Sequence, residues 1–196
     1  MIKSLNNFLS SNELNLAIEY WKIKEQSLKP CGQEKNAVAE YSDILSETFL
    51  KIKQPIVEEA VGEKLIPTYS YSRMYYRGSE LKRHVDRPPC EISVSFSIFG
   101  TDNWKLWFHK LIEERGKVVD PNAQPTSITI KAGDGAVYEG CQYQHWRDPY
   151  DGEKGMQIFI HYIRANGRYK AFTYDGRKTL GIQKTNQAMK ELWSNV

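Results

Sequence analysis

The sequence predicts an α+β fold, with helices first and a β-sandwich or jelly-roll core after them. The main helical periodicity lies in the first 60 or so residues. Between about residues 65 and 165, six or more short segments alternate apolar and polar side chains, as strands do. Turn-forming residues separate these segments, which indicates short connections between neighbouring strands.

Two helical stretches are expected in the lead-in. Ser10 and Glu13 have the spacing of a capping box, and apolar residues follow at helical intervals: Leu14, Ala17, Ile18 and Trp21. A second pattern runs from about 38 to 61. Pro55 lies inside it and should kink or split the helix, and Gly62 is a suitable stop.

The strand series begins after residue 64. The expected strands are LIPTYSYSRMYYR, EISVSFSIF, WKLWFHK, TSITI, GAVYEG and MQIFIHYI. The segment KTNQAMKELW near the end is expected to form a last short helix. We therefore predict one domain over 1–196, with a helical lead-in (about 1–63), a β-core (about 65–165) and a C-terminal extension (about 166–196).

Bulk composition narrows the function classes. The 196 residues are 40% hydrophobic, which is enough for one ordinary core. A net charge of +3 is too small to favour a nucleic-acid partner. The sequence contains no 18-residue apolar stretch, so no membrane span is expected. Three widely spaced cysteines are typical of reduced thiols, so a cytoplasmic location is expected.

One of the four histidines, His84, is two residues before a carboxylate, Asp86. His145 follows 61 residues after His84. Two strands of one barrel can bring these side chains together. Two imidazoles and one carboxylate on one face of Fe(II) leave other positions open for a cosubstrate and dioxygen. His161 is the competing distal ligand, but its place in an alternating strand favours a partly buried structural histidine.

These motifs resemble the Fe(II)/2-oxoglutarate dioxygenases, specifically the prolyl-4-hydroxylase-like branch. The matching features are Tyr75-Tyr76-Arg77-Gly78, then His84-Val85-Asp86, the AGDGAVYEG segment and His145. The lead-in LNNFLSSNELNLAIEYW is also similar, so the resemblance covers roughly residues 5 to 165. It implies a double-stranded β-helix (jelly-roll, cupin-like) core with N-terminal packing helices, and His84, Asp86 and His145 as metal ligands.

The resemblance also implies an activity. A hydroxylase of this kind uses Fe(II), 2-oxoglutarate and O2, with ascorbate as a supporting reductant, to hydroxylate a C–H bond of a prolyl or other peptidyl residue. Small amino acids and natural-product scaffolds are open as alternative substrates. Because Asp86 is present, hydroxylation is favoured over chlorination. The alternatives are a non-oxygenase cupin-like metal protein, such as an isomerase or a sensor, and a catalytically silent binding module.

The residues that would hold 2-oxoglutarate are harder to assign. By resemblance, Tyr75 hydrogen-bonds the cosubstrate, and a basic residue follows the distal histidine by about ten positions. Lys154 has nearly that spacing, and Arg73, on the face of Tyr75, is the reserve. Gln157 is a neutral inward candidate that supplies no charge. A surface salt bridge is the favoured interpretation of three arginines: Arg73, Arg147 and Arg164.

Overall fold

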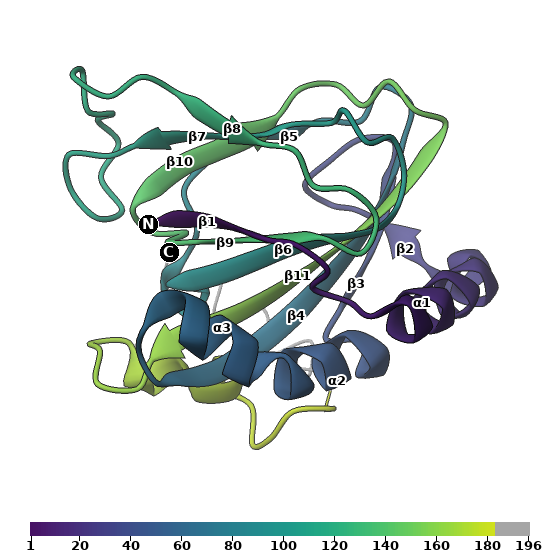
Figure 1. Ribbon diagram of the computed structural model, residues 1–196, viewed down its shortest axis with the longest axis horizontal. Coiled ribbons are helices and arrows are strands. Elements are labelled where there is room, and N and C mark those ends of the chain that lie inside the picture. The colour runs from purple at the N-terminus through teal and green to yellow at the C-terminus, as the bar shows by residue number, and fades with distance from the viewer. Residues whose placement is uncertain (183–196) are drawn as a thin grey trace.

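Two antiparallel sheets face one another, and helices cover the outer side of one of them (Figure 1). The computed structural model describes residues 1–182. The larger sheet has seven strands in the order β1 (Ile2–Leu5), β9 (Gly135–Tyr138), β6 (Ile92–Phe99), β11 (Lys154–Arg164), β4 (Leu65–Tyr76), β3 (Ala37–Tyr41) and β2 (Lys29–Pro30). The smaller sheet has four, in the order β5 (Leu81–His84), β10 (Tyr143–Arg147), β7 (Leu106–Lys110) and β8 (Thr126–Ile128).

Strand β11 lies at the centre of the larger sheet, between β6 and β4. Its alternation sends one set of side chains to the helices and the other set between the sheets. The helix-facing set belongs to the main hydrophobic core: Met156, Ile158, Ile160 and Tyr162. The inward set contains Phe159 and His161, which line the interior cavity. Both faces of the strand are buried, so its side-chain pattern determines what the cavity contains.

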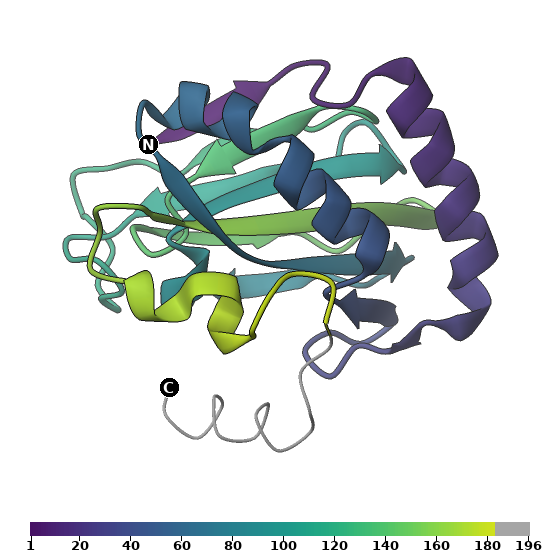
Figure 2. The ribbon, with the colours of Figure 1, turned by 90° about the horizontal axis from the view of Figure 1, so that it is seen from below.

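Three helices pack against the larger sheet, as Figure 2 shows: α1 (Ser11–Lys24), α2 (Ile44–Ile52) and α3 (Gln54–Val61). The capping box between Ser10 and Glu13 is present. Pro55 lies in the first turn of α3, so it splits the second helical stretch as predicted. Gly62 ends α3 with a φ of 85°, in the left-handed region that glycine adopts at low cost.

The prediction that the second helical stretch begins at about residue 38 was wrong. Residues 37–41 form β3, which pairs with the edge of β4, and β1 and β2 also join the larger sheet. Pairing with a strand distant in sequence outweighed the local helical spacing. Strands β5 and β10 were not anticipated either. The expected helix at KTNQAMKELW lies outside the described residues.

Three short 3₁₀ segments complete the elements: η1 (Glu25–Ser27), η2 (Pro88–Cys90) and η3 (Lys170–Gly176). Segment η2 follows β5 and leads into β6, whereas η3 packs against β4 and η2. Among residues 1–182, no helix combines the length and apolarity that a membrane span requires.

Candidate metal and cosubstrate site

The strand pairing of the smaller sheet brings the three predicted metal ligands together. His145 on β10 is the register partner of His84 at the end of β5. Asp86 follows two residues later, and its Oδ1 lies 3.6 Å from the Nε2 atom of each histidine. The two imidazole rings are 4.2 Å apart between centroids. One ligand atom from each residue lies within 4.8 Å of the others, which suits a single metal ion.

Hydrogen bonds orient both imidazoles toward the same point. His84 Nδ1 is 2.8 Å from the carbonyl oxygen of Lys82, and His145 Nδ1 is 3.1 Å from that of Tyr143. A ring N–H that donates to a carbonyl fixes the tautomer and leaves Nε2 unprotonated for a metal. The donor set of two imidazole nitrogens and one carboxylate therefore fits Fe(II), with room for further ligands on the opposite side.

The charges of the three residues are strongly coupled. Burial alone would raise the pKa of Asp86, but the charge of His145 and a hydrogen bond with His84 hold it well below its usual range. Burial and the neighbouring His84 lower the pKa of His145 to about 4. Burial opposes protonation of His84 too, yet the hydrogen bond and charge of Asp86 outweigh it and raise that pKa. At neutral pH the set thus offers an ionised carboxylate and a neutral His145.

Two residues that the sequence reasoning missed hold Asp86 in place. Ser93, on β6, donates its hydroxyl to Asp86 Oδ2 at 2.8 Å, which leaves Oδ1 facing the histidines. Gly140 packs directly against Asp86, and its carbonyl oxygen accepts the Asp86 N–H at 3.1 Å. A Cβ at Gly140 would collide with Asp86 Oδ2 and with the carbonyl oxygen of Cys90. The alternation of serines with apolar residues along β6 was the available signal, because it places Ser93 on the face opposite to the apolar residues.

The three ligands open onto a cavity of about 820 Å³ between the sheets. Strand β4 lines it with Tyr69, Tyr71 and Arg73, and β11 lines it with Phe159 and His161. Aromatic rings therefore form much of the wall on the side of the larger sheet. This volume and lining suit a cosubstrate together with part of a substrate.

Arg73 is a buried cation of this cavity that pairs with no carboxylate among residues 1–182. Its side chain is 3% exposed, and its two terminal nitrogens donate to the Tyr75 hydroxyl at 3.2 Å and to Gln33 Oε1 at 2.6 Å. Its Nε is buried and has no hydrogen-bond acceptor in the described part of the chain. The shared face of Arg73 and Tyr75 is as predicted, but the surface salt bridge is wrong for this arginine.

Arg147 is a second buried arginine, on β10 two residues beyond His145. It is 2% exposed and donates to the Trp104 carbonyl oxygen at 2.6 Å and, weakly, to Gln157 Oε1 at 3.4 Å. Within residues 1–182 it forms no ion pair with an acidic side chain, and its Nε has no acceptor. Burial lowers the pKa of Arg147 to about 10. A surface salt bridge is again the wrong interpretation.

The two arginines lie at one level of the interior. Gln157 is the register partner of Arg73 on the neighbouring strand, and it also contacts Arg147 from the opposite sheet. The charge of each arginine acts on the Tyr75 hydroxyl, whose pKa burial raises. On β10, Arg147 follows the metal ligand His145 by two residues, across an irregularity in the pairing with β5.

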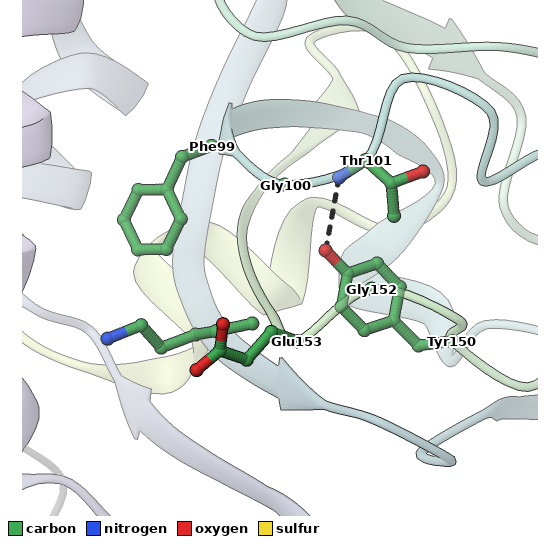
Figure 3. A pocket seen from close by; sticks show the side chains of 7 residues that line it. Phe99, Gly100, Thr101, Tyr150, Gly152 and Glu153 are labelled. Carbon is green, nitrogen blue, oxygen red and sulfur yellow. Dashed lines mark hydrogen bonds between the residues drawn. The ribbon is translucent and has the colours of Figure 1, made fainter.

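Lys154 does not line the cavity between the sheets, so the prediction that its side chain reaches the cosubstrate was wrong. Alternation puts Lys154 on the helix-facing side of β11, where its Nζ pairs with Glu25 at 2.7 Å. It lines a shallow surface depression whose other walls include Phe99 and Tyr150, and the Tyr150 hydroxyl accepts the Thr101 N–H at 3.1 Å (Figure 3). Spacing from His145 alone did not reveal on which face the lysine would fall.

Arg164 and His161 are the two remaining candidates. Arg164 forms ion pairs with Glu63, Glu91 and Glu139, so the salt-bridge interpretation holds for it. His161 is buried and packs against Tyr69 with the rings tilted by 34° and their centroids 4.6 Å apart. It lies beside Asp86 but outside the group formed with His84 and His145.

Comparison with solved structures supports the fold. A prolyl-4-hydroxylase from Pseudomonas putida superposes with a TM-score of 0.63 at 12% identity, covering 84% of this chain and 93% of that one. A 2OG-Fe(II) oxygenase family oxidoreductase from Burkholderia pseudomallei gives 0.65 at 14% identity, covering 89% and 87%. The epimerase SnoN, solved with Fe³⁺, alpha-ketoglutarate and nogalamycin RO, gives 0.66 at 9% identity, covering 94% and 88%.

The sequence itself matches no protein-family model and no curated protein. The structural likeness confirms the predicted fold class: the chain has the double-stranded β-helix of 2-oxoglutarate-Fe(II) oxygenases, the fold that the motif resemblance implied. Identities of 9–14% establish the fold alone, and these neighbours include an epimerase as well as a hydroxylase.

Proposed function

We propose that this chain is an Fe(II)- and 2-oxoglutarate-dependent oxygenase that hydroxylates a C–H bond. The proposal depends on one observation: the interior holds a metal-ligand set and two buried arginines that pair with no acidic side chain within residues 1–182. A buried cation without an acidic partner is costly, and an anionic ligand removes that cost. His84, Asp86 and His145 would hold the metal, and Arg73 and Arg147 would bind the distal carboxylate of 2-oxoglutarate.

The metal, when bound together with 2-oxoglutarate and O2, supplies the oxidative decarboxylation that drives hydroxylation. The protein contributes orientation. Ser93 holds one oxygen of Asp86, so a single oxygen is directed at the metal. The Tyr75 hydroxyl and Gln157 Oε1 each accept a hydrogen bond from one of the two guanidinium groups and help to hold it in place. The guanidinium groups themselves would donate charge-assisted hydrogen bonds to a carboxylate, which are the stronger kind. The aromatic walls of β4 and β11 exclude water from the oxidising side.

Arg73 is the residue we assign to direct contact, because it lines the cavity together with the metal ligands. Arg147 supplies a second positive charge from the smaller sheet. Lys154 is not part of this site because its ammonium group is paired with Glu25 on the helical side. The substrate class, peptidyl or small-molecule, is left open in this proposal.

Calorimetric binding of 2-oxoglutarate to the metal-loaded protein under anaerobic conditions tests the proposal. Wild-type protein should bind 2-oxoglutarate only after Fe(II) has been added. Arg73→Gln and Arg147→Gln should each weaken that binding strongly, whereas Lys154→Gln, the matched control, should leave it unchanged. Metal binding without any affinity for 2-oxoglutarate would instead favour the cupin-like isomerase or sensor.

A further inference from the structure

Beside the His84 set lies a second group of potential metal ligands, formed by Asp86, Cys90 and His161. One ligand atom of each lies within 4.8 Å of the others. Cys90 comes from η2 and His161 from β11, and they are 2% and 5% exposed. Asp86 belongs to both groups. Its Oδ1 faces the two histidines of the first group, while its Oδ2 is on the side of Ser93.

Hydrogen bonding fixes the tautomer of His161. The Ser93 hydroxyl has one proton and donates it to Asp86 Oδ2 at 2.8 Å. The Ser93 hydroxyl oxygen is also 2.9 Å from His161 Nδ1, so Ser93 accepts the Nδ1–H of His161. Nε2 then carries the lone pair, and no hydrogen bond to it is formed within the described part of the chain. A metal-binding histidine commonly has this arrangement, with one N–H anchored and the other nitrogen available.

Cys90 adds a soft ligand. It is a free thiol, and its Sγ lies 3.0 Å from the hydroxyl of Tyr69. A thiolate and an imidazole together select Zn²⁺ and similar ions, whereas two imidazoles and a carboxylate suit Fe(II). The two groups therefore differ in the metal that they favour, although they are joined through one carboxylate.

We propose that Asp86, Cys90 and His161 bind a second, thiophilic divalent ion such as Zn²⁺, with Asp86 shared between this ion and the one at His84 and His145. Binding breaks the S–H bond of Cys90, forms a sulfur–metal bond and releases one proton to solvent. No electron is transferred. The second ion does not depend on the proposed oxygenase activity, because every ligand is a side chain of this protein.

Titration of the metal-free protein with Co²⁺ tests the second site, since cobalt bound to a thiolate gives an intense near-ultraviolet charge-transfer band. The wild-type protein should bind two ions and show the band. Cys90→Ala should bind one ion and lack the band, whereas Cys31→Ser should retain it. His145→Ala should keep the band, because only the first group is disrupted. Thermal unfolding curves establish that each variant is folded.

His161→Gln provides a second test if Cys90→Ala does not fold. It should bind one ion fewer than the wild type and show at most a weak band. Absence of the band in the wild-type protein at two equivalents of Co²⁺, or its persistence in Cys90→Ala, would overturn the second site. If the wild-type protein shows the charge-transfer band but does not bind 2-oxoglutarate, only the proposed oxygenase activity is contradicted.

Discussion

Replacing Gly140 by alanine should remove metal binding at His84, Asp86 and His145, although residue 140 is not itself a ligand. A Cβ at this position would lie 2.5 Å from the carbonyl oxygen of Cys90 and closer still to Asp86 Oδ2. Real Cβ atoms essentially never approach within 3.0 Å of such atoms, so Asp86 must move by more than about 0.5 Å. Metal–ligand distances tolerate changes of only about 0.2 Å.

The expected loss is large because the carboxylate is one of three protein ligands. Changes that disturb only the support of a ligand cost about 10–100-fold in metal affinity, so displacing the ligand itself should cost about 100-fold or more. Equilibrium dialysis with Mn²⁺ or Co²⁺ measures this affinity. Gly32→Ala is the matched control, because a Cβ there meets nothing within 4 Å. A folded Gly140→Ala protein with wild-type affinity would refute the role assigned to this contact.

Four further predictions concern the same interior. Alanine at His84, Asp86 or His145 should abolish Fe(II) binding at the first group by metal analysis, whereas His161→Ala should retain that ion; the reverse result would exchange the two histidines. Arg73→Gln should raise the dissociation constant for 2-oxoglutarate by roughly 10²–10³-fold, since breaking a buried charge pair costs about 3–5 kcal/mol; an unchanged constant would leave Arg147 as the contact. Metal affinity should decline about tenfold per pH unit below the pKa of His84, because the metal needs a neutral imidazole, and the raised pKa makes the decline begin above the usual 6.5; a flat profile down to pH 5 would contradict this. Chlorinated product should be undetectable by mass spectrometry, because Asp86 occupies the position that a halide would need, and chlorination as the main reaction would contradict the hydroxylase.

The sequence was most informative where alternation and motif agreed. Strand β6 alternates apolar residues with serines along most of its length, and β4 and β11 are rich in apolar and aromatic residues because both of their faces are buried. His84 and Asp86 are local in sequence and needed only one distant partner, His145. The register of β10 with β5 provides that partner, and no local pattern could have shown the register.

The cosubstrate residues show what local spacing cannot predict. Counting from His145 favoured Lys154, but a strand reverses its face at every residue, and Lys154 falls on the helical side. Arg73 and Arg147 were undervalued because an arginine is usually exposed. Their burial arises from the closing of two sheets over them, which is a tertiary effect. The roles of Gly140 and Cys90 likewise could not be predicted from the sequence, because they depend on the proximity of both residues to Asp86 in the fold.

Turnover of 2-oxoglutarate tests the central claim most directly. Anaerobically reconstituted protein with Fe(II) and ascorbate is exposed to O2 and 2-oxoglutarate, with and without peptide and small-molecule pools, and succinate is quantified. We predict succinate formation that requires Fe(II), is stimulated by a pool containing the substrate, and is lost in Asp86→Ala but kept in Lys154→Gln. Fully metal-loaded, folded wild-type protein that forms no succinate under any of these conditions would contradict the assignment.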